Sequence, residues 1–176
     1  MLNSPLATAT RWASRFFSGI FAGFLIAVLV FEWSLRSFDR HVYTQVRQVE
    51  LDSLDKLAVV TLIPAMIATA LLIAVTLKAT GSVPWLLPTA LALLIAILAL
   101  TLAVNLPINA DQLGWSVQGP PANWAAVRDH WQIAHAVRSG AAVLAYAALS
   151  ADATTVRRAV PGAASADREL PAVPTK

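Results

Sequence analysis

Two long stretches of the chain contain no charged residue, and they limit what the chain can fold into. Residues 57–77 are uncharged for 21 residues, and residues 83–106 are uncharged for 24. A helix needs about 20 mostly apolar residues to cross the hydrocarbon core of a bilayer. Charged residues make up only 13% of the whole chain, about half the ~25% of soluble globular domains. Both features argue against a soluble enzyme.

Two further segments complete a predicted set of four spans. The first covers residues 16–35 and carries no charge before Glu32. The fourth covers residues 124–150 and is the least apolar, because its apolar part contains His135 and Arg138. A central arginine costs about 2.5–3.5 kcal/mol on insertion scales. This segment therefore needs protein partners inside the membrane.

The segment between the first two spans has a pattern of its own. Val42, Val46, Val49 and Ser53 or Leu54 recur at helical spacing, with Arg47, Gln48 and Glu50 between them. Such a pattern predicts an amphipathic helix that leads into the second span. The predicted fold is therefore all-α: a four-helix transmembrane bundle with an amphipathic outer helix between spans 1 and 2.

Lysine and arginine residues predict the orientation. With four spans, both termini and the 78–82 loop share one side, which carries seven Lys or Arg residues against four on the other side. Basic residues concentrate in cytoplasmic loops. We therefore expect a multi-pass protein of the plasma (inner) membrane with both termini cytoplasmic. The expected domains are a cytoplasmic N-terminal segment at 1–15, a four-span membrane domain at 16–150 and a disordered cytoplasmic tail at 151–176.

The fourth span carries the most informative pattern. Trp124, Arg128, Trp131, His135 and Arg138 are spaced by four, three, four and three residues. In a helix this spacing places all five on one face. Polar side chains of a membrane helix face the bundle interior or a wet cavity. The pattern therefore predicts a polar stripe that points inward.

Polar residues of other spans are expected at the same depth in the membrane as this stripe. Glu32 and Asn105 lie near the outer ends of their spans, about as deep as His135 and Arg138. A Glu32–Arg138 pair would act either as a structural salt bridge or as part of a catalytic site. His135 has three interpretations at this point: an interhelical hydrogen-bonding group, a proton acceptor, or a metal or haem ligand.

The inventory of residues excludes several classes of site. The chain has no cysteine, which excludes disulfides, thiolate metal sites and cysteine nucleophiles. It contains no Glu-x-x-His pair, no Walker loop and no G-x-S-x-G motif. Diiron bundles, P-loop enzymes and α/β-hydrolases are therefore not supported.

One block of residues resembles a known family. Asn105-Leu-Pro-Ile-Asn109, followed by Trp124 and by Trp131-Gln-Ile-Ala-His135-Ala-Val-Arg138, resembles the signature of the anthrone oxygenase-like integral membrane proteins. The glycine pair Gly19-Ile-Phe-Ala-Gly23 fits the same group, since such pairs let helices approach closely in lipid. The resemblance implies a four-helix membrane protein. In characterised fungal members it implies oxidation of an anthrone to an anthraquinone with dioxygen.

The resemblance also implies roles for individual residues. His135 is the candidate general base, with Arg138 and Asn105 as partners of the developing oxyanion. The candidate substrate-binding residues are Trp131, Trp124, Arg128, Asn109 and Glu32. Glu32 is not part of the family signature, so its role is open. No cofactor or metal is predicted, and dioxygen is the co-substrate if the protein is an enzyme.

A second class of function stays open beside the oxidase. The chain would then be a non-enzymatic membrane protein that binds a lipophilic small molecule or a membrane partner. In both cases the expected partners are the lipid bilayer and a hydrophobic small molecule, with no nucleic acid. The sequence leaves a homo-oligomer open.

Overall fold

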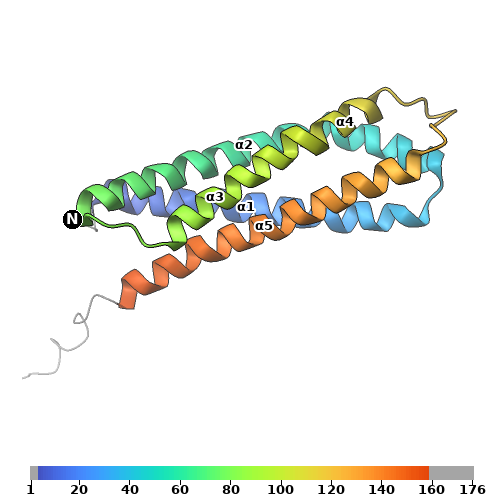
Figure 1. The fold of residues 1–176 in the computed structure, drawn as a ribbon. Helices are drawn as coiled ribbons and strands as arrows, with labels where there is room; N and C mark the ends of the chain where they lie inside the picture. The colour runs from blue at the N-terminus through green and yellow to red at the C-terminus, as the bar shows by residue number, and fades with distance from the viewer. Residues whose placement is uncertain (1–3, 159–176) are drawn as a thin grey trace, which may run out of the picture.

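The computed structural model describes residues 4–158 and consists of long helices that run side by side (Figure 1). The described residues contain no strand, and the predicted all-α fold is confirmed. The elements are α1 (Pro5–Ser34), a 3₁₀ turn η1 (Leu35–Ser37), α2 (Arg40–Thr80), α3 (Leu86–Leu100), a π-helical turn η2 (Thr101–Asn105), α4 (Leu106–Leu113) and α5 (Trp124–Arg158).

Four helical stretches are long and apolar enough to span a membrane, as predicted. Large apolar side chains cover their outward faces, such as Ile133 with 67% of its surface exposed and Leu144 with 61%. An apolar surface of this extent is uncommon on soluble monomers, whereas lipid tails solvate it. The chain is a multi-pass membrane protein. Its spans are Pro5–Ser37, Lys56–Thr80, Leu86–Leu113 and Trp124–Asp152.

The four long helices enclose one main core. α1 packs against α2 and α5, and α3 packs against α5 and α2 (Figure 1). Interlocking aliphatic and aromatic side chains fill the space between them, including Phe21, Leu25, Leu72, Leu94 and Leu149. A smaller cluster of Leu35, Tyr43 and Trp115 lies where α1 ends and α2 begins.

The first and last helices, α1 and α5, are longer than the sequence predicted. α1 begins at Pro5 instead of residue 16, because Ser4 caps it by accepting the Ala7 N–H at 3.2 Å and proline suits a first helical turn. α5 continues to Arg158, so the first part of the predicted tail at 151–176 is helical. The rest of that tail, from residue 159, lies outside the described residues.

The predicted amphipathic outer helix is the first part of α2, but its faces are inverted. Arg47 and Glu50 are buried, at 2% and 6% exposure, whereas Val49 is 65% exposed. Asp39 starts this helix, because its side chain accepts the backbone N–H groups of the next turn. Val42 and Val49 face outward, whereas Val46 is half-buried against the Leu35, Tyr43 and Trp115 cluster. The charged groups find their hydrogen-bonding partners inside the bundle.

The Asn105–Asn109 block does not end the third span. The chain widens into the π-helical turn η2 and continues as α4, with Pro107 in its first turn. A proline has no N–H to give to the preceding turn, and the Leu106 N–H bonds the carbonyl of Thr101, five residues back. Such π turns occur mostly at functional sites.

The glycine pair of α1 provides a test of the packing. A Cβ at Gly19 would lie 3.1 Å from the ring of Tyr146 on α5, whereas a Cβ at Gly23 would meet nothing within 4 Å. Gly19→Leu should therefore force α1 and α5 apart and destabilise the bundle by about 1–3 kcal/mol. Gly23→Leu, the matched control, should leave the melting temperature in detergent nearly unchanged. Equal melting temperatures for both variants would contradict this packing.

Candidate functional site

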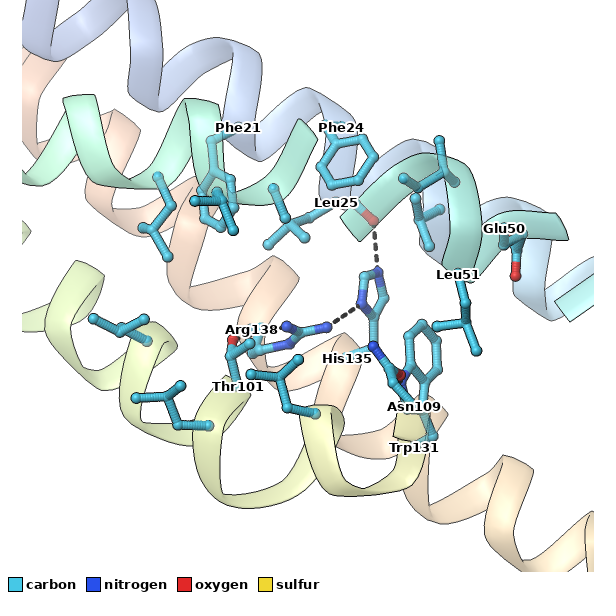
Figure 2. A pocket seen from close by; sticks show the side chains of 18 of the residues that line it. Phe21, Phe24, Leu25, Glu50, Leu51, Thr101, Asn109, Trp131, His135 and Arg138 are labelled. Carbon is cyan, nitrogen blue, oxygen red and sulfur yellow. Dashed lines mark hydrogen bonds between the residues drawn. The ribbon is translucent and has the colours of Figure 1, made fainter. Parts of the chain in front are cut away.

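A single cavity brings the polar residues of the bundle together. It has a volume of about 180 Å³ and lies between α1, α2, the η2–α4 region and α5. Most of its wall is aliphatic or aromatic, with Phe21, Phe24 and Leu25 from α1 (Figure 2). The polar side chains on the wall are Arg47, Glu50, Thr101, Asn109, His135 and Arg138.

The predicted stripe on α5 faces the interior, but only part of it reaches the cavity. Trp131, His135 and Arg138 line the cavity and are at most 7% exposed. Trp124 packs instead on Tyr43, with the ring centroids 5.5 Å apart. Arg128 lies over Trp124 and bonds Asp129. These two predicted substrate-binding residues therefore lie beyond the cavity wall.

His135 has both ring nitrogens engaged. Its Nε2 lies 2.9 Å from the Leu25 carbonyl oxygen, and its Nδ1 lies 2.8 Å from an Arg138 nitrogen (Figure 2). A guanidinium only donates, so Nδ1 accepts this bond and Nε2–H donates to the carbonyl. The ring is therefore the neutral imidazole. It also stacks on Trp131, with centroids 4.7 Å apart and planes 8° apart.

Arg138 is held at the cavity wall by acceptors that include His135 and Thr101. Besides His135, it donates to Thr101 Oγ1 at 2.8 Å. Thr101 is the first residue of η2, so the π turn contributes directly to this contact. The predicted pairing with Glu32 is wrong, because the ion pair of Glu32 is with another arginine.

That arginine is Arg47, which binds groups on three other helices. One guanidinium nitrogen, Nη1, lies 3.1 Å from Glu32 Oε1 on α1 and 3.0 Å from Glu50 Oε2 on α2 itself. Its guanidinium also lies 3.9 Å from the centroid of the Trp131 ring, a cation–π distance. The remaining bonds go to α4, from Nε to Gln112 Oε1 at 2.9 Å and from Nη2 to Asn109 Oδ1 at 2.8 Å.

Glu32 is fully buried by this cluster. It has 0% exposure, and Gln132 donates to its backbone oxygen at 2.8 Å and to its Oε2 at 3.0 Å. Glu32 does not line the cavity, but its carboxyl group lies beside the one that does. Glu32 therefore lies at the level of the α5 stripe, but its partner is Arg47 instead of Arg138.

Among the described residues that line the cavity, the acidic one is Glu50. Burial raises the pKa of Glu50 to about 8, and the charge of Glu32 and a hydrogen bond with it add to this rise, while Arg47 opposes it. Two carboxylates are both acceptors, so a hydrogen bond between them requires a proton. The Glu32–Glu50 pair therefore exchanges one proton close to neutral pH, and the ionised fraction is the form that can accept a proton.

The two asparagines of the family block have different positions. Asn109 lines the cavity, and its Oδ1 accepts from Trp131 Nε1 at 2.7 Å as well as from Arg47. Asn105 is buried behind the wall, where its Nδ2 reaches the Trp131 carbonyl at 3.4 Å. Asn105 thus fixes η2 against α5 instead of reaching into the cavity.

The sequence argument missed part of the site. The sequence pattern places Arg47 and Glu50 on an amphipathic helix outside the predicted site, and it does not distinguish Gln132. Tyr43, Arg47 and Glu50 are spaced by four and three residues, the same rule that identified the α5 stripe. Within residues 4–158, no three His, Asp or Glu side chains gather as a metal site requires.

These features define a class: a four-span membrane protein with an apolar cavity between two arginine-centred polar groups. The family model for anthrone oxygenase matches residues 56–148, more than half of the chain. The chain therefore belongs to the anthrone oxygenase family, as its sequence signature predicted. No curated protein and no solved structure matches the chain. His135, Arg138 and both asparagines lie within the matched range, whereas Glu32, Arg47 and Glu50 precede it.

The pKa of Glu50 predicts a stability that falls with pH. The pKa is 4.5 ordinarily and about 8 in the folded protein. Between these values the folded state binds more protons than the unfolded state, so the free energy of unfolding decreases as pH rises through this window. Melting temperatures measured from pH 4.5 to about 8 should fall, and Glu50→Gln should flatten that slope.

Asp52→Asn serves as the control for this measurement, since Asp52 is exposed on the same helix. It should keep the slope of the parent protein. The charged or titratable groups that face Glu50 are Glu32, Arg47 and Tyr43. An unchanged slope in Glu50→Gln would assign the titration to another group.

Proposed function

We propose that the protein is a membrane oxygenase that uses dioxygen to oxidise a flat, hydrophobic, anthrone-like phenolic substrate. The observation that carries this proposal is the cavity, which is apolar over most of its wall and polar where α2, α4 and α5 meet. Its volume of about 180 Å³ exceeds the ~150 Å³ of an engineered apolar cavity that binds benzene. Membership of the anthrone oxygenase family supports the same reaction class.

The reaction needs little machinery. An anthrone is a carbon acid: its methylene C–H bond breaks, the proton goes to a base, and the electron pair delocalises onto the ring oxygen. The anion then gives electrons to dioxygen, and a C–O bond forms. Loss of the second methylene hydrogen with cleavage of the O–O bond yields a carbonyl group. In sum, one methylene group and one dioxygen give one carbonyl group and one water.

The protein then has three tasks. It holds the flat molecule, for which the stacked rings of Trp131 and His135 provide a wall. It stabilises the oxyanion, for which Arg138 is the cation at the wall, positioned by Thr101 and His135. It also receives a proton, and among the described residues on the wall His135 and Glu50 are the side chains that could accept it. The base role of His135 stays a prediction, and it requires Arg138 to release Nδ1.

His135 is the residue whose loss should affect activity most selectively. His135→Ala should lower the rate of anthrone oxidation by ~10²-fold or more, because either a base or the acceptor that positions Arg138 is lost. Dioxygen consumption and product absorbance, with the purified protein in detergent, provide the measurement. His130→Ala is the matched control, since His130 is exposed on the same helix and should be nearly silent.

Equal losses in both histidine variants would contradict a site at His135. Binding of anthrone by the parent protein without oxygen consumption would instead favour the alternative function, a non-enzymatic binder of lipophilic molecules. A tryptophan fluorescence titration reports that binding, because Trp131 forms part of the wall.

We also propose the plasma (inner) membrane as the location, with both termini cytoplasmic. The seven-to-four bias in Lys and Arg supports this orientation. Reporter fusions after Lys78 should read cytoplasmic and fusions at Gly114 external. The opposite readings would reverse the orientation.

A further inference from the structure

We propose that Glu50 is the base that takes the proton from the substrate, with Glu32 and Arg47 as the residues that position it. This inference rests on the proposed function and assigns the proton acceptor that the reaction needs. It concerns residues that precede the range matched by the family model.

Glu50 lies where a proton acceptor for a molecule in the cavity is needed. Glu50 lines the cavity (Figure 2) and is 6% exposed. Its Oε2 is bound to Arg47 at 3.0 Å, and while both carboxylates are ionised no donor in the described part of the chain reaches its buried Oε1. A buried carboxylate oxygen without a donor is costly, and a substrate proton would satisfy it.

The charge of the cluster favours uptake of one proton. Glu32 and Glu50 share a single cation, Arg47, so the fully ionised cluster carries one excess negative charge in a buried site. One added proton makes the cluster neutral, which lowers the desolvation penalty. The pKa of Glu50, raised by burial to about 8, lies near neutral pH, where a general base is most effective.

Unlike Glu50, His135 lies where an added proton is unfavourable. Its Nδ1 already accepts a hydrogen bond from Arg138. A proton on that nitrogen would break the bond and place two positive charges side by side in a buried site, where like charges repel strongly. His135 therefore serves better as the acceptor that positions Arg138 than as the base.

The proton transfer moves charge across the cavity. The substrate C–H bond breaks, the proton forms a bond with Glu50 Oε1, and the electron pair stays on the substrate as its oxyanion. The negative charge thus leaves the Arg47 cluster and comes to lie near Arg138, which lines the same cavity. Dioxygen then oxidises the anion as described above.

Anaerobic mixing separates proton transfer from oxidation. The full-length protein in detergent is mixed with anthrone without oxygen. The visible absorption of the anthrone anion is recorded together with the total amount of bound anthrone. The parent protein and Asp52→Asn should bind anthrone as the anion. Glu50→Gln should bind it as the neutral form and lose ~10²-fold or more in oxidation rate under air. His135→Ala should still form the anion.

The pH dependence of the oxidation rate distinguishes a base from a residue that only supports the fold. In Glu50→Gln, oxidation should recover at high pH, where the anthrone ionises in solution and needs no base. In Glu32→Gln, a variant that keeps Glu50, the acidic limb of the rate profile should shift to lower pH, because the neighbouring negative charge is gone. This second variant keeps the proposal testable if Glu50→Gln does not fold.

The outcomes are distinct for the two proposals. Anion formation in Glu50→Gln at the parent level, or its loss only in His135→Ala, would overturn Glu50 as the base. Binding of neutral anthrone by the parent protein would overturn it as well. Anion formation in the parent protein without oxidation under air would support the base and refute the oxygenase function.

Discussion

The buried guanidinium of Arg47 is the group on which the rest of the site depends. Two carboxylates, two amide oxygens and an aromatic face surround it, and these come from α1, α2, α4 and α5. Removing one member of a buried ion pair typically costs about 3–5 kcal/mol, because the other charge is left unpaired. In this cluster two carboxylates would lose their cation at once. The same contacts also fix Asn109 and Trp131, two parts of the cavity wall.

The spans and the α5 stripe were predictable because each follows from one physical rule. Uncharged runs of membrane length leave few alternatives, and the four-and-three spacing places Trp131, His135 and Arg138 on one face of any helix. Depth in the membrane also placed Glu32 near this stripe. Depth does not fix how each helix is rotated about its axis, however, so it did not identify Arg47 as the partner of Glu32.

The inverted faces of α2 have a related cause. Helical periodicity shows that the valines and the charged residues of this segment lie on different faces. It does not show which face is internal when lipid competes with the protein interior for apolar side chains. A polar residue next to a membrane gains most from fixed partners inside the bundle, as Arg47 and Glu50 do. The π turn was also beyond the sequence pattern, because Asn and Pro are typical of helix ends, and here the chain continues past Pro107.

The length of α2 has a consequence for where this chemistry takes place. Its 41 residues make a rod of about 60 Å, roughly twice the ~30 Å of hydrocarbon in a bilayer. The span occupies its second part, from Lys56, and Glu50 comes before it. The cavity wall includes residues on both sides of this point, such as Glu50 and Val59. The cavity wall therefore extends past the start of the α2 span, while its residues on α1, α4 and α5 lie within their spans. A lipid-soluble molecule that enters such a cavity partitions into it from the acyl chains, so its occupancy would follow the amount of that molecule per lipid instead of its concentration in water.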